Sequence, residues 1–131
     1  MLFRSDVCQR EGIGVIARVP FDEGSLTGTL TAGSRWPQGD FRNIYFKPPY
    51  LQQALDRVGP VEELTKSWGS SLPDTALRFV LAHPAVTTVI PGMRKPAHVD
   101  ANLAVSGNAM PAEQRDRLRA FRWNRRPDDR A

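Results

Sequence analysis

A short β-branched segment that stops at a Pro-Gly pair constrains the fold of this chain more than any other stretch. Residues 87–90 read Thr-Thr-Val-Ile, and the Pro-Gly pair follows directly. Two cations, Arg94 and Lys95, come next, before Pro96, a residue favoured in the first turn of a helix. A strand that leads basic side chains to a helix N-terminus is suited to binding a phosphate group.

A second apolar run, residues 13–17 with the sequence Ile-Gly-Val-Ile-Ala, predicts another strand. This run lacks polar alternation, which predicts that both of its faces are covered, as in a parallel sheet. Several other segments have a helical pattern. They are residues 2–8, 51–58, 60–68, 71–83 and 96–103, and a last segment that begins at residue 111.

Local signals set the expected boundaries of these helices. Ser71 precedes Leu-Pro-Asp and predicts a capped helix start. The Gly-Pro pair at residues 59–60 predicts that the helical pattern breaks or kinks there. In the 96–103 helix, Val99 and Leu103 are expected to face inward. Residues 21–49, rich in glycine, proline and aromatic residues, are expected to be irregular, with aromatics that cover either a ligand or the domain's own core.

Strands that alternate with helices predict an α/β fold with parallel pairing. In such a fold, the loops that follow the two strands leave the sheet at the same carboxyl edge, where ligands bind. Arg18 and Arg94 are therefore expected to face a common site. Two strands alone do not form a sheet with both faces covered, so the pattern is typical of part of a larger structure.

The composition is that of one small domain. The chain has 131 residues, of which 40% are hydrophobic, and Cys8 is its only cysteine. A lone cysteine and the lack of an apolar run of about 20 residues favour a soluble, cytoplasmic protein without membrane contact. Most of the excess positive charge lies in arginines between residues 115 and 130. We interpret these as a solvated helix face and tail; a nucleic-acid contact is the alternative.

Several classes of site find no support in the sequence. His83 and His98 are the only histidines, and neither belongs to a metal-binding or nucleophile-activating pattern. There is no Gly-rich phosphate loop followed by Lys-Ser or Lys-Thr. Gly12 and Gly14 lie before a predicted strand, whereas a dinucleotide fingerprint follows one. We therefore predict neither catalytic residues nor metal ligands.

Residues 12–28, Gly-Ile-Gly-Val-Ile-Ala-Arg-Val-Pro-Phe-Asp-Glu-Gly-Ser-Leu-Thr-Gly, resemble the seventh strand and following loop of the aldo-keto reductases. Residues 76–102 resemble their last barrel helix, eighth strand and phosphate loop, and Trp36 with residues 40–42 resembles the intervening aromatic loop. The resemblance implies the C-terminal part of a (β/α)8 TIM barrel, an incomplete barrel of two parallel strands with flanking helices. It would span residues 1–131, structured over 1–123 with a tail at 124–131.

The resemblance also implies binding of a nicotinamide cofactor, NADP. Arg18 would lie against the nicotinamide, and Gly92 and Arg94 would hold the 2′-phosphate. The full set of implied cofactor-binding residues is Arg18, Pro20, Phe21, Gly24, Leu26, Pro91, Gly92, Arg94, His98 and Asn102. The residues alone leave other interpretations open: an ion pair of Arg18 with Asp22 or Glu23, a purely solvated Arg94, and a helix-surface role for Asn102.

The family's catalytic Asp, Tyr, Lys and His come from earlier strands than those this chain resembles. Tyr45 and Tyr50 lie in a different segment and do not take that tyrosine's role. We therefore expect this chain alone to be inactive, and to act on a carbonyl substrate only within a complete barrel. The alternative is a non-catalytic nucleotide-binding or partner-docking protein. Open sheet edges also predict possible self-association.

Overall fold

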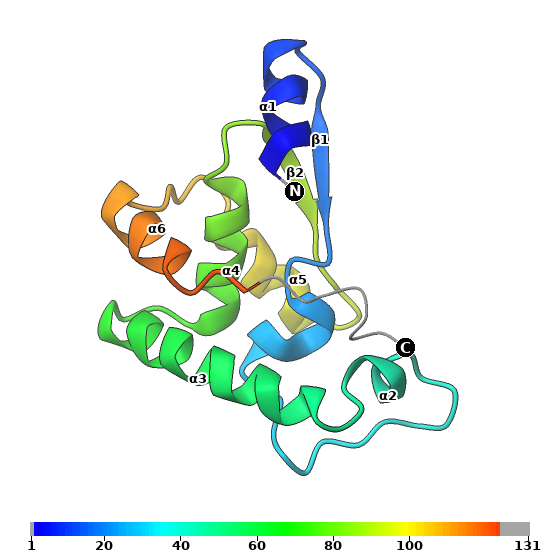
Figure 1. Ribbon diagram of the computed structural model, residues 1–131. Coiled ribbons are helices and arrows are strands. Elements are labelled where there is room, and N and C mark those ends of the chain that lie inside the picture. Colours follow the sequence, from blue (N-terminus) through cyan, green and yellow to red (C-terminus); the bar gives the residue numbers. More distant parts are fainter. Residues whose placement is uncertain (1, 124–131) are drawn as a thin grey trace.

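The computed structural model describes residues 2–123, in which two parallel strands stand beside a group of helices (Figure 1). The expected tail, residues 124–131, lies outside this part of the chain. The elements, in order, are α1 (Leu2–Arg10), β1 (Val15–Arg18), the 3-10 helix η1 (Asp22–Thr27), α2 (Arg42–Tyr45), α3 (Tyr50–Ser67), α4 (Leu72–Leu81), β2 (Val86–Ile90), α5 (Pro96–Leu103) and α6 (Ala112–Arg119).

The sheet consists of β1 and β2, which pair in parallel as predicted. The register places Ile16 opposite Thr88 and Arg18 opposite Ile90. One irregularity lies near Val15, whose backbone N–H donates to Oγ1 of Thr87 at 3.2 Å. At this point the side-chain hydroxyl of Thr87, and not a backbone carbonyl of β2, accepts the hydrogen bond from β1. Both strands lie within two residues of their predicted positions.

The expectation that both faces of the strands are covered is wrong for the described residues. Ile16 and Ile90 are 62% and 52% exposed, and the register puts them on the same face of the sheet. Helix α4 packs against β2, and the valines Val15, Val86 and Val89 are half-buried. The helices thus cover one side of the strands, and residues 2–123 leave the side of Ile16 open.

Helix α3 continues through Pro60, so the helix does not break there; the alternative, a kink at the Gly-Pro pair, stays a prediction. Proline removes one helical hydrogen bond and crowds the preceding turn. Ala54 and Thr65, which lie on either side of Pro60, are both fully buried. They are eleven residues apart, which is about three helical turns, so they share one face. Packing along this face holds one helix across the proline.

Helix α4 is the centre of the fold. Its predicted N-cap is confirmed: Oγ of Ser71 accepts a hydrogen bond from the backbone N–H of Asp74 at 3.2 Å. The face of the helix that contains Leu77, which is only 1% exposed, packs against neighbouring elements. These neighbours are α3, η1, β2 and α5. The apolar stripe of α4 therefore organises every element that leads to the carboxyl edge of the sheet.

Two further expectations need correction. Residues 21–49 are not wholly irregular, because they include η1 and α2. Helix α5 has the predicted bounds, but Leu103 is 63% exposed, whereas Val99 is half-buried. The chain turns just after this short helix, and Val105 takes the buried position instead. No helix within residues 2–123 is long and apolar enough to cross a membrane.

Candidate functional site at the carboxyl edge of the sheet

The parallel pairing brings the two predicted loops to one edge. Arg18, the last residue of β1, lies opposite Ile90, the last residue of β2. The loop that leads into η1 and the loop that leads into α5 therefore start side by side. This is the arrangement that the sequence predicted for a ligand site, although the two strands are separated by η1, α2, α3 and α4 along the chain.

The loop after β1 has an unusual backbone. Val19, Asp22 and Glu23 have φ angles of 53°, 47° and 55°, in the left-handed region that L-residues avoid. This conformation costs roughly 1–2 kcal/mol for each residue. Such strain persists only where the surroundings hold it, and it is concentrated at functional sites. Here η1 packs against both α3 and α4.

Hydrogen bonds within the loop help to hold this conformation. Oγ of Ser25, which is 2% exposed, donates to Oδ2 of Asp22 at 2.7 Å. The hydroxyl of Thr27 donates to the carbonyl oxygen of Gly24 at 2.6 Å. The other carboxylate oxygen of Asp22 accepts a hydrogen bond from the hydroxyl of Tyr45, a residue of α2. The loop is thus connected to a segment more than twenty residues away.

The loop after β2 is tied to the helix that it enters. Nδ2 of Asn102, in α5, donates to the carbonyl oxygen of Gly92 at 3.3 Å. Asn102 is half-buried, and this hydrogen bond gives it a contact beyond its own helix. No side chain caps the N-terminus of α5, where Lys95 is the N-cap residue and Pro96 opens the helix. The positive end of the helix dipole therefore faces the same loop.

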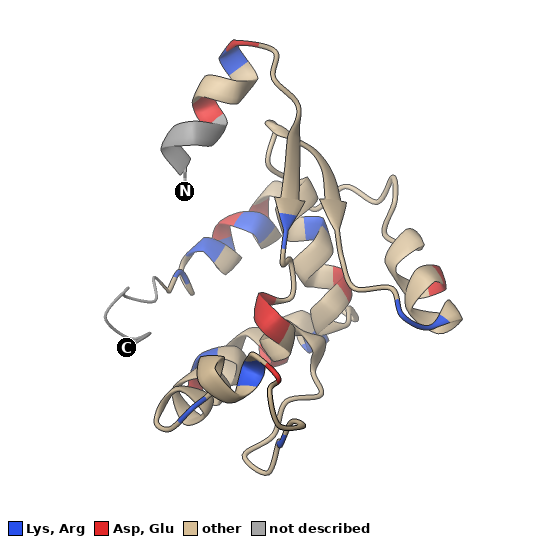
Figure 2. Ribbon diagram, turned by 90° about the vertical axis from the view of Figure 1, so that its right-hand side faces the viewer, with Lys and Arg blue, Asp and Glu red and all other residues tan. Residues whose placement is uncertain are grey.

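Within the described residues, the basic side chains at this edge form no salt bridge. Arg18, Arg94 and Lys95 are exposed, and within residues 2–123 their side chains make no ion pair or hydrogen bond. The alternative ion pair of Arg18 with Asp22 or Glu23 is therefore absent. Figure 2 shows basic colouring at the end of β1 and on the segment that leads into α5. These positive charges remain available to an anion.

A separate ion pair lies in the segment between η1 and α2. The carboxylate of Asp40 accepts hydrogen bonds from Nε of Arg42 at 3.0 Å and from NH2 at 2.7 Å. These bonds, with a smaller contribution from Arg94, lower the pKa of Asp40 from 3.8 to about 2. Conversely, the Asp40 bond raises the pKa of Arg42. Arg94 is thus close enough to Asp40 for its charge to be felt there.

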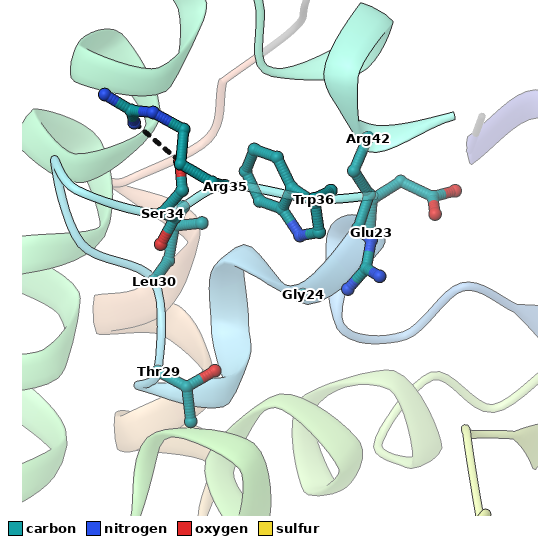
Figure 3. A pocket seen from close by; sticks show the side chains of 8 residues that line it. All are labelled: Glu23, Gly24, Thr29, Leu30, Ser34, Arg35, Trp36 and Arg42. Carbon is teal, nitrogen blue, oxygen red and sulfur yellow. Dashed lines mark hydrogen bonds between the residues drawn. The ribbon is translucent and has the colours of Figure 1, made fainter. Parts of the chain in front are cut away.

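A small cavity of about 130 Å³ opens beside this pair (Figure 3). The guanidinium of Arg42 lies 5.6 Å from the centre of the Trp36 ring, and both side chains line the cavity together with Glu23 and Gly24. The remaining lining residues are Thr29, Leu30, Ser34 and Arg35. Trp36 in turn stacks on Phe46 with ring centres 5.3 Å apart. The aromatic loop therefore packs largely on itself and on the core.

The predicted cofactor-binding residues fall into two groups at this edge. The first group lies at the end of β1 and in the loop that follows: Arg18, Pro20, Phe21, Gly24 and Leu26. The second lies in the loop after β2 and in α5: Pro91, Gly92, Arg94, His98 and Asn102. Pro20 is buried, and Phe21 and Leu26 are half-buried, whereas Arg94 and His98 are exposed. The hydrophobic members of the first group thus support the loop from inside.

Sequence reasoning missed Tyr45 and Ser25, whose hydroxyls donate hydrogen bonds to Asp22. It also missed the role of Arg42, which pairs with Asp40. Asp22 and Tyr45 are 23 positions apart and share no repeat or periodic pattern. Of these contacts, the sequence signalled only the pair of Asp40 and Arg42, because an acidic and a basic residue two positions apart can form a local ion pair. Within residues 2–123, no group of three or more histidine, cysteine, aspartate or glutamate side chains could hold a metal ion.

The chain is similar in sequence to known proteins. A family model described as the Aldo/keto reductase family matches residues 3–122. The probable pyridoxal reductase 2 of Schizosaccharomyces pombe is 27% identical over 118 residues, which are 83% of this chain and 35% of the yeast protein. The NADH-specific methylglyoxal reductase of Escherichia coli is 26% identical over 99 residues, which are 75% of this chain and 30% of that protein.

A solved structure agrees with the fold. The glycerol dehydrogenase of Gluconobacter oxydans superposes with a TM-score of 0.76 at 25% sequence identity. The match covers 87% of this chain and 35% of that chain. The chain thus spans about a third of the length of these relatives, and its two strands with their helices correspond to one part of a larger barrel.

Proposed function

The chain belongs to the aldo/keto reductase family, and we propose that its carboxyl edge is the NADP-binding portion of a carbonyl reductase. One observation carries this proposal. The register of Arg18 opposite Ile90 places a strained loop and an unpaired basic loop at the same edge of the sheet. A dinucleotide with several phosphate groups needs such a pair of anchoring points, set apart along one edge.

The second loop suits the 2′-phosphate of NADP. Arg94 can offer two parallel N–H groups to a phosphate, and Lys95 adds a second positive charge. The uncapped N-terminus of α5 favours an anion in the same place. Asn102 holds the carbonyl of Gly92 and thereby fixes the backbone between β2 and α5. In this proposal His98, in the first turn of α5, lies beside the adenosine.

The first loop suits the other half of the cofactor. The exposed guanidinium of Arg18 can lie flat against the nicotinamide ring. The backbone around Gly24, buttressed by Phe21 and Leu26, would hold the pyrophosphate. Gly24, with a φ of 110° and no side chain, lets the main chain of this loop approach an anion closely. When bound, the nicotinamide supplies the hydride for carbonyl reduction.

Catalysis is a property of the complete barrel in this proposal. The family resemblance assigns the catalytic Asp, Tyr, Lys and His to strands other than β1 and β2. Positioning a carbonyl against the cofactor also requires a pocket closed by those strands. We therefore propose that these 131 residues alone bind the cofactor without reducing a substrate. The relatives are named for different substrates, so in this proposal residues in the rest of the barrel select the carbonyl compound.

The test is calorimetric titration of the purified chain with 2′,5′-ADP and with 5′-AMP, which lacks the 2′-phosphate. We expect 2′,5′-ADP to bind more tightly. Replacing Arg94 by alanine should weaken its binding by about 10- to 100-fold, which is the value of one hydrogen bond between charged groups. The affinity for 5′-AMP should stay the same in this variant.

Arg119→Ala is the matched control, because it removes the same charge from α6, where Arg119 pairs with Asp116 at 3.5 Å. Its affinity for 2′,5′-ADP should stay within about twofold of the unmodified chain. Equal affinities for the two nucleotides would contradict a 2′-phosphate site and point to NAD, the preference for which the Escherichia coli relative is named. Failure of both nucleotides to bind would contradict the proposed function.

A further inference from the structure

The hydroxyl of Tyr45, the last residue of α2, contacts the loop after β1. It donates a hydrogen bond to Oδ1 of Asp22, while Oγ of Ser25 donates to Oδ2 at 2.7 Å. Both carboxylate oxygens of Asp22 are therefore engaged. Asp22 is the first residue of η1, and its φ of 47° and that of Glu23 at 55° lie in the left-handed region. The bond from Tyr45 thus ends on the most strained part of the loop.

The tyrosine ring itself is held firmly. It meets Phe46 edge-on, with ring centres 4.9 Å apart and planes at 84°, and it contacts Phe41 at 5.8 Å. Phe46 is buried and stacks on Trp36. Aromatic packing therefore helps to set the position of the hydroxyl. A donor positioned in this way can help to hold a strained backbone in a costly conformation.

Charge gives the bond a second effect. A free carboxylate in a loop that faces a pyrophosphate would repel it. Donors from Tyr45 and Ser25 occupy both oxygens of Asp22 and hold the carboxylate in one orientation. Loss of the Tyr45 hydroxyl would therefore relax the loop and also leave the carboxylate free to turn towards the anion.

We propose that Tyr45 is a positioning residue for the cofactor pyrophosphate: through Asp22 it keeps the loop after β1 in its left-handed, anion-accepting conformation. This inference rests on the proposed function. It differs from a plain stabilising role in one respect. Loss of the hydroxyl should lower the affinity for ligands that contact the loop after β1, and should leave unchanged the affinity for ligands that contact only the loop after β2.

Two ligands make that distinction in the purified chain. NADP⁺ carries the pyrophosphate and spans both loops, whereas 2′,5′-ADP reaches mainly the loop that contains Arg94. Tyr45→Phe removes the hydroxyl and keeps the ring. We expect this variant to bind NADP⁺ about tenfold more weakly, as for the loss of one hydrogen bond to a charged group, while its affinity for 2′,5′-ADP is unchanged.

Ser67→Ala is the control, because its hydroxyl donates to the carbonyl of Leu64 within α3, at a distance of 2.7 Å and away from the loop. It should leave both affinities unchanged. Hydrogen exchange provides a readout that needs no ligand. In Tyr45→Phe the amides of residues 21–27 should exchange faster, while those of α4 keep their protection.

The outcomes separate the two proposals. Equal losses for NADP⁺ and 2′,5′-ADP, or faster exchange throughout α4, would mean that Tyr45 only stabilises the fold, and the inference would be wrong. Unchanged NADP⁺ affinity in Tyr45→Phe would overturn it as well. If the unmodified chain binds neither nucleotide, the proposed function and the ligand role of Tyr45 both fail, and the exchange rates still decide whether Tyr45 holds the loop. Should Tyr45→Phe fail to fold, Ser25→Ala replaces it with the same expected ratio of affinities, because it removes the other donor to Asp22 and keeps the carboxylate.

Discussion

At the scale of single residues, the carboxylate of Asp40 accepts several hydrogen bonds from one neighbour, Arg42. Its Oδ1 accepts hydrogen bonds from both the backbone N–H and Nε of Arg42, at 2.9 and 3.0 Å, and its Oδ2 accepts one from NH2. The same guanidinium lies over Trp36. Arg42 thus joins an acid and an aromatic ring, and this fixes the chain just before α2.

This pair predicts an acid-sensitive contribution to stability. The pKa of Asp40 is about 2 in the folded chain and 3.8 ordinarily, mainly because Arg42 hydrogen-bonds the ionised carboxylate. A depressed folded-state pKa means that the contribution is complete above a pH of about 4 and is lost as the pH falls towards 2. In Arg42→Ala, a carbon-13 NMR titration should show the pKa of Asp40 rising towards 3.8.

Arg35→Ala serves as the control for this titration. Arg35 lies in the same loop but donates to the backbone carbonyls of Ala32 and Ser34, not to Asp40. The pKa of Asp40 should therefore stay near 2 in that variant. A pKa of Asp40 that is already near 3.8 in the unmodified chain would show that the pair does not form in solution.

At the scale of elements, the two-stranded ribbon is the least protected part of the molecule. Each strand has one hydrogen-bonded neighbour within residues 2–123, and Ile16 and Ile90 are exposed on the same face. Parallel sheets normally have both faces covered. Unpaired edges and exposed apolar faces favour association with another chain.

We therefore predict that the purified chain self-associates through this ribbon. Its weight-average sedimentation coefficient should rise with protein concentration, and Ile16→Lys should reduce that rise by placing a charge on the exposed face. Ile44→Lys is the matched control, because Ile44 is 59% exposed on α2, outside the ribbon. A concentration-independent monomer, or an equal effect of both lysine variants, would contradict the prediction.

The helices show the opposite behaviour, because they are well supported. Helix α4 has its N-cap, a buried apolar face and contacts with four neighbouring elements. Helix α3 continues through a proline because its buried face continues on both sides.

On α6, Arg115 and Arg119 lie beside Asp116, and Arg117 lies over Trp68. These contacts favour the interpretation of that basic segment as a solvated helix face; the arginines beyond residue 123 lie outside the described residues.

At the scale of the whole molecule, the chain corresponds to about a third of the length of its relatives. It contains both loops of the proposed cofactor site. The proposed function therefore assigns binding and catalysis to different parts of one barrel. In such a barrel the remaining strands would continue the sheet from its two open edges, and the face with Ile16, opposite the helices, would line the interior.

This division predicts that the chain alone shows no reductase activity. The purified 131-residue protein, mixed with NADPH and 4-nitrobenzaldehyde, should consume NADPH no faster than a blank without protein. The physical reason is that the family resemblance assigns the general acid to strands other than β1 and β2, and those strands would also close the pocket around the aldehyde. A full-length family member assayed in parallel shows that the assay detects turnover. Turnover above the blank by the chain itself would refute the assignment.

The sequence by itself determined the features that depend on neighbours along the chain. The strands, the Ser71 cap, the bounds of α5 and the placement of both loops at one edge all follow from local residue patterns and from the rule for parallel strands. These signals are local because backbone conformation and side-chain periodicity are set within a few residues. The family resemblance added the proposed cofactor.

Only the tertiary structure decided which distant side chains meet. The bond between Tyr45 and Asp22, the exposure of Leu103 and the continuity of α3 at Pro60 depend on contacts between separate elements. A sequence pattern carries no record of such contacts, because a hydrogen bond between residues 23 positions apart obeys no period. The strained loop after β1 has a similar origin. Aspartate adopts the left-handed region more readily than most residues, but Glu23 does not, and packing on α3 and α4 together with the hydrogen bonds to Asp22 holds both residues there.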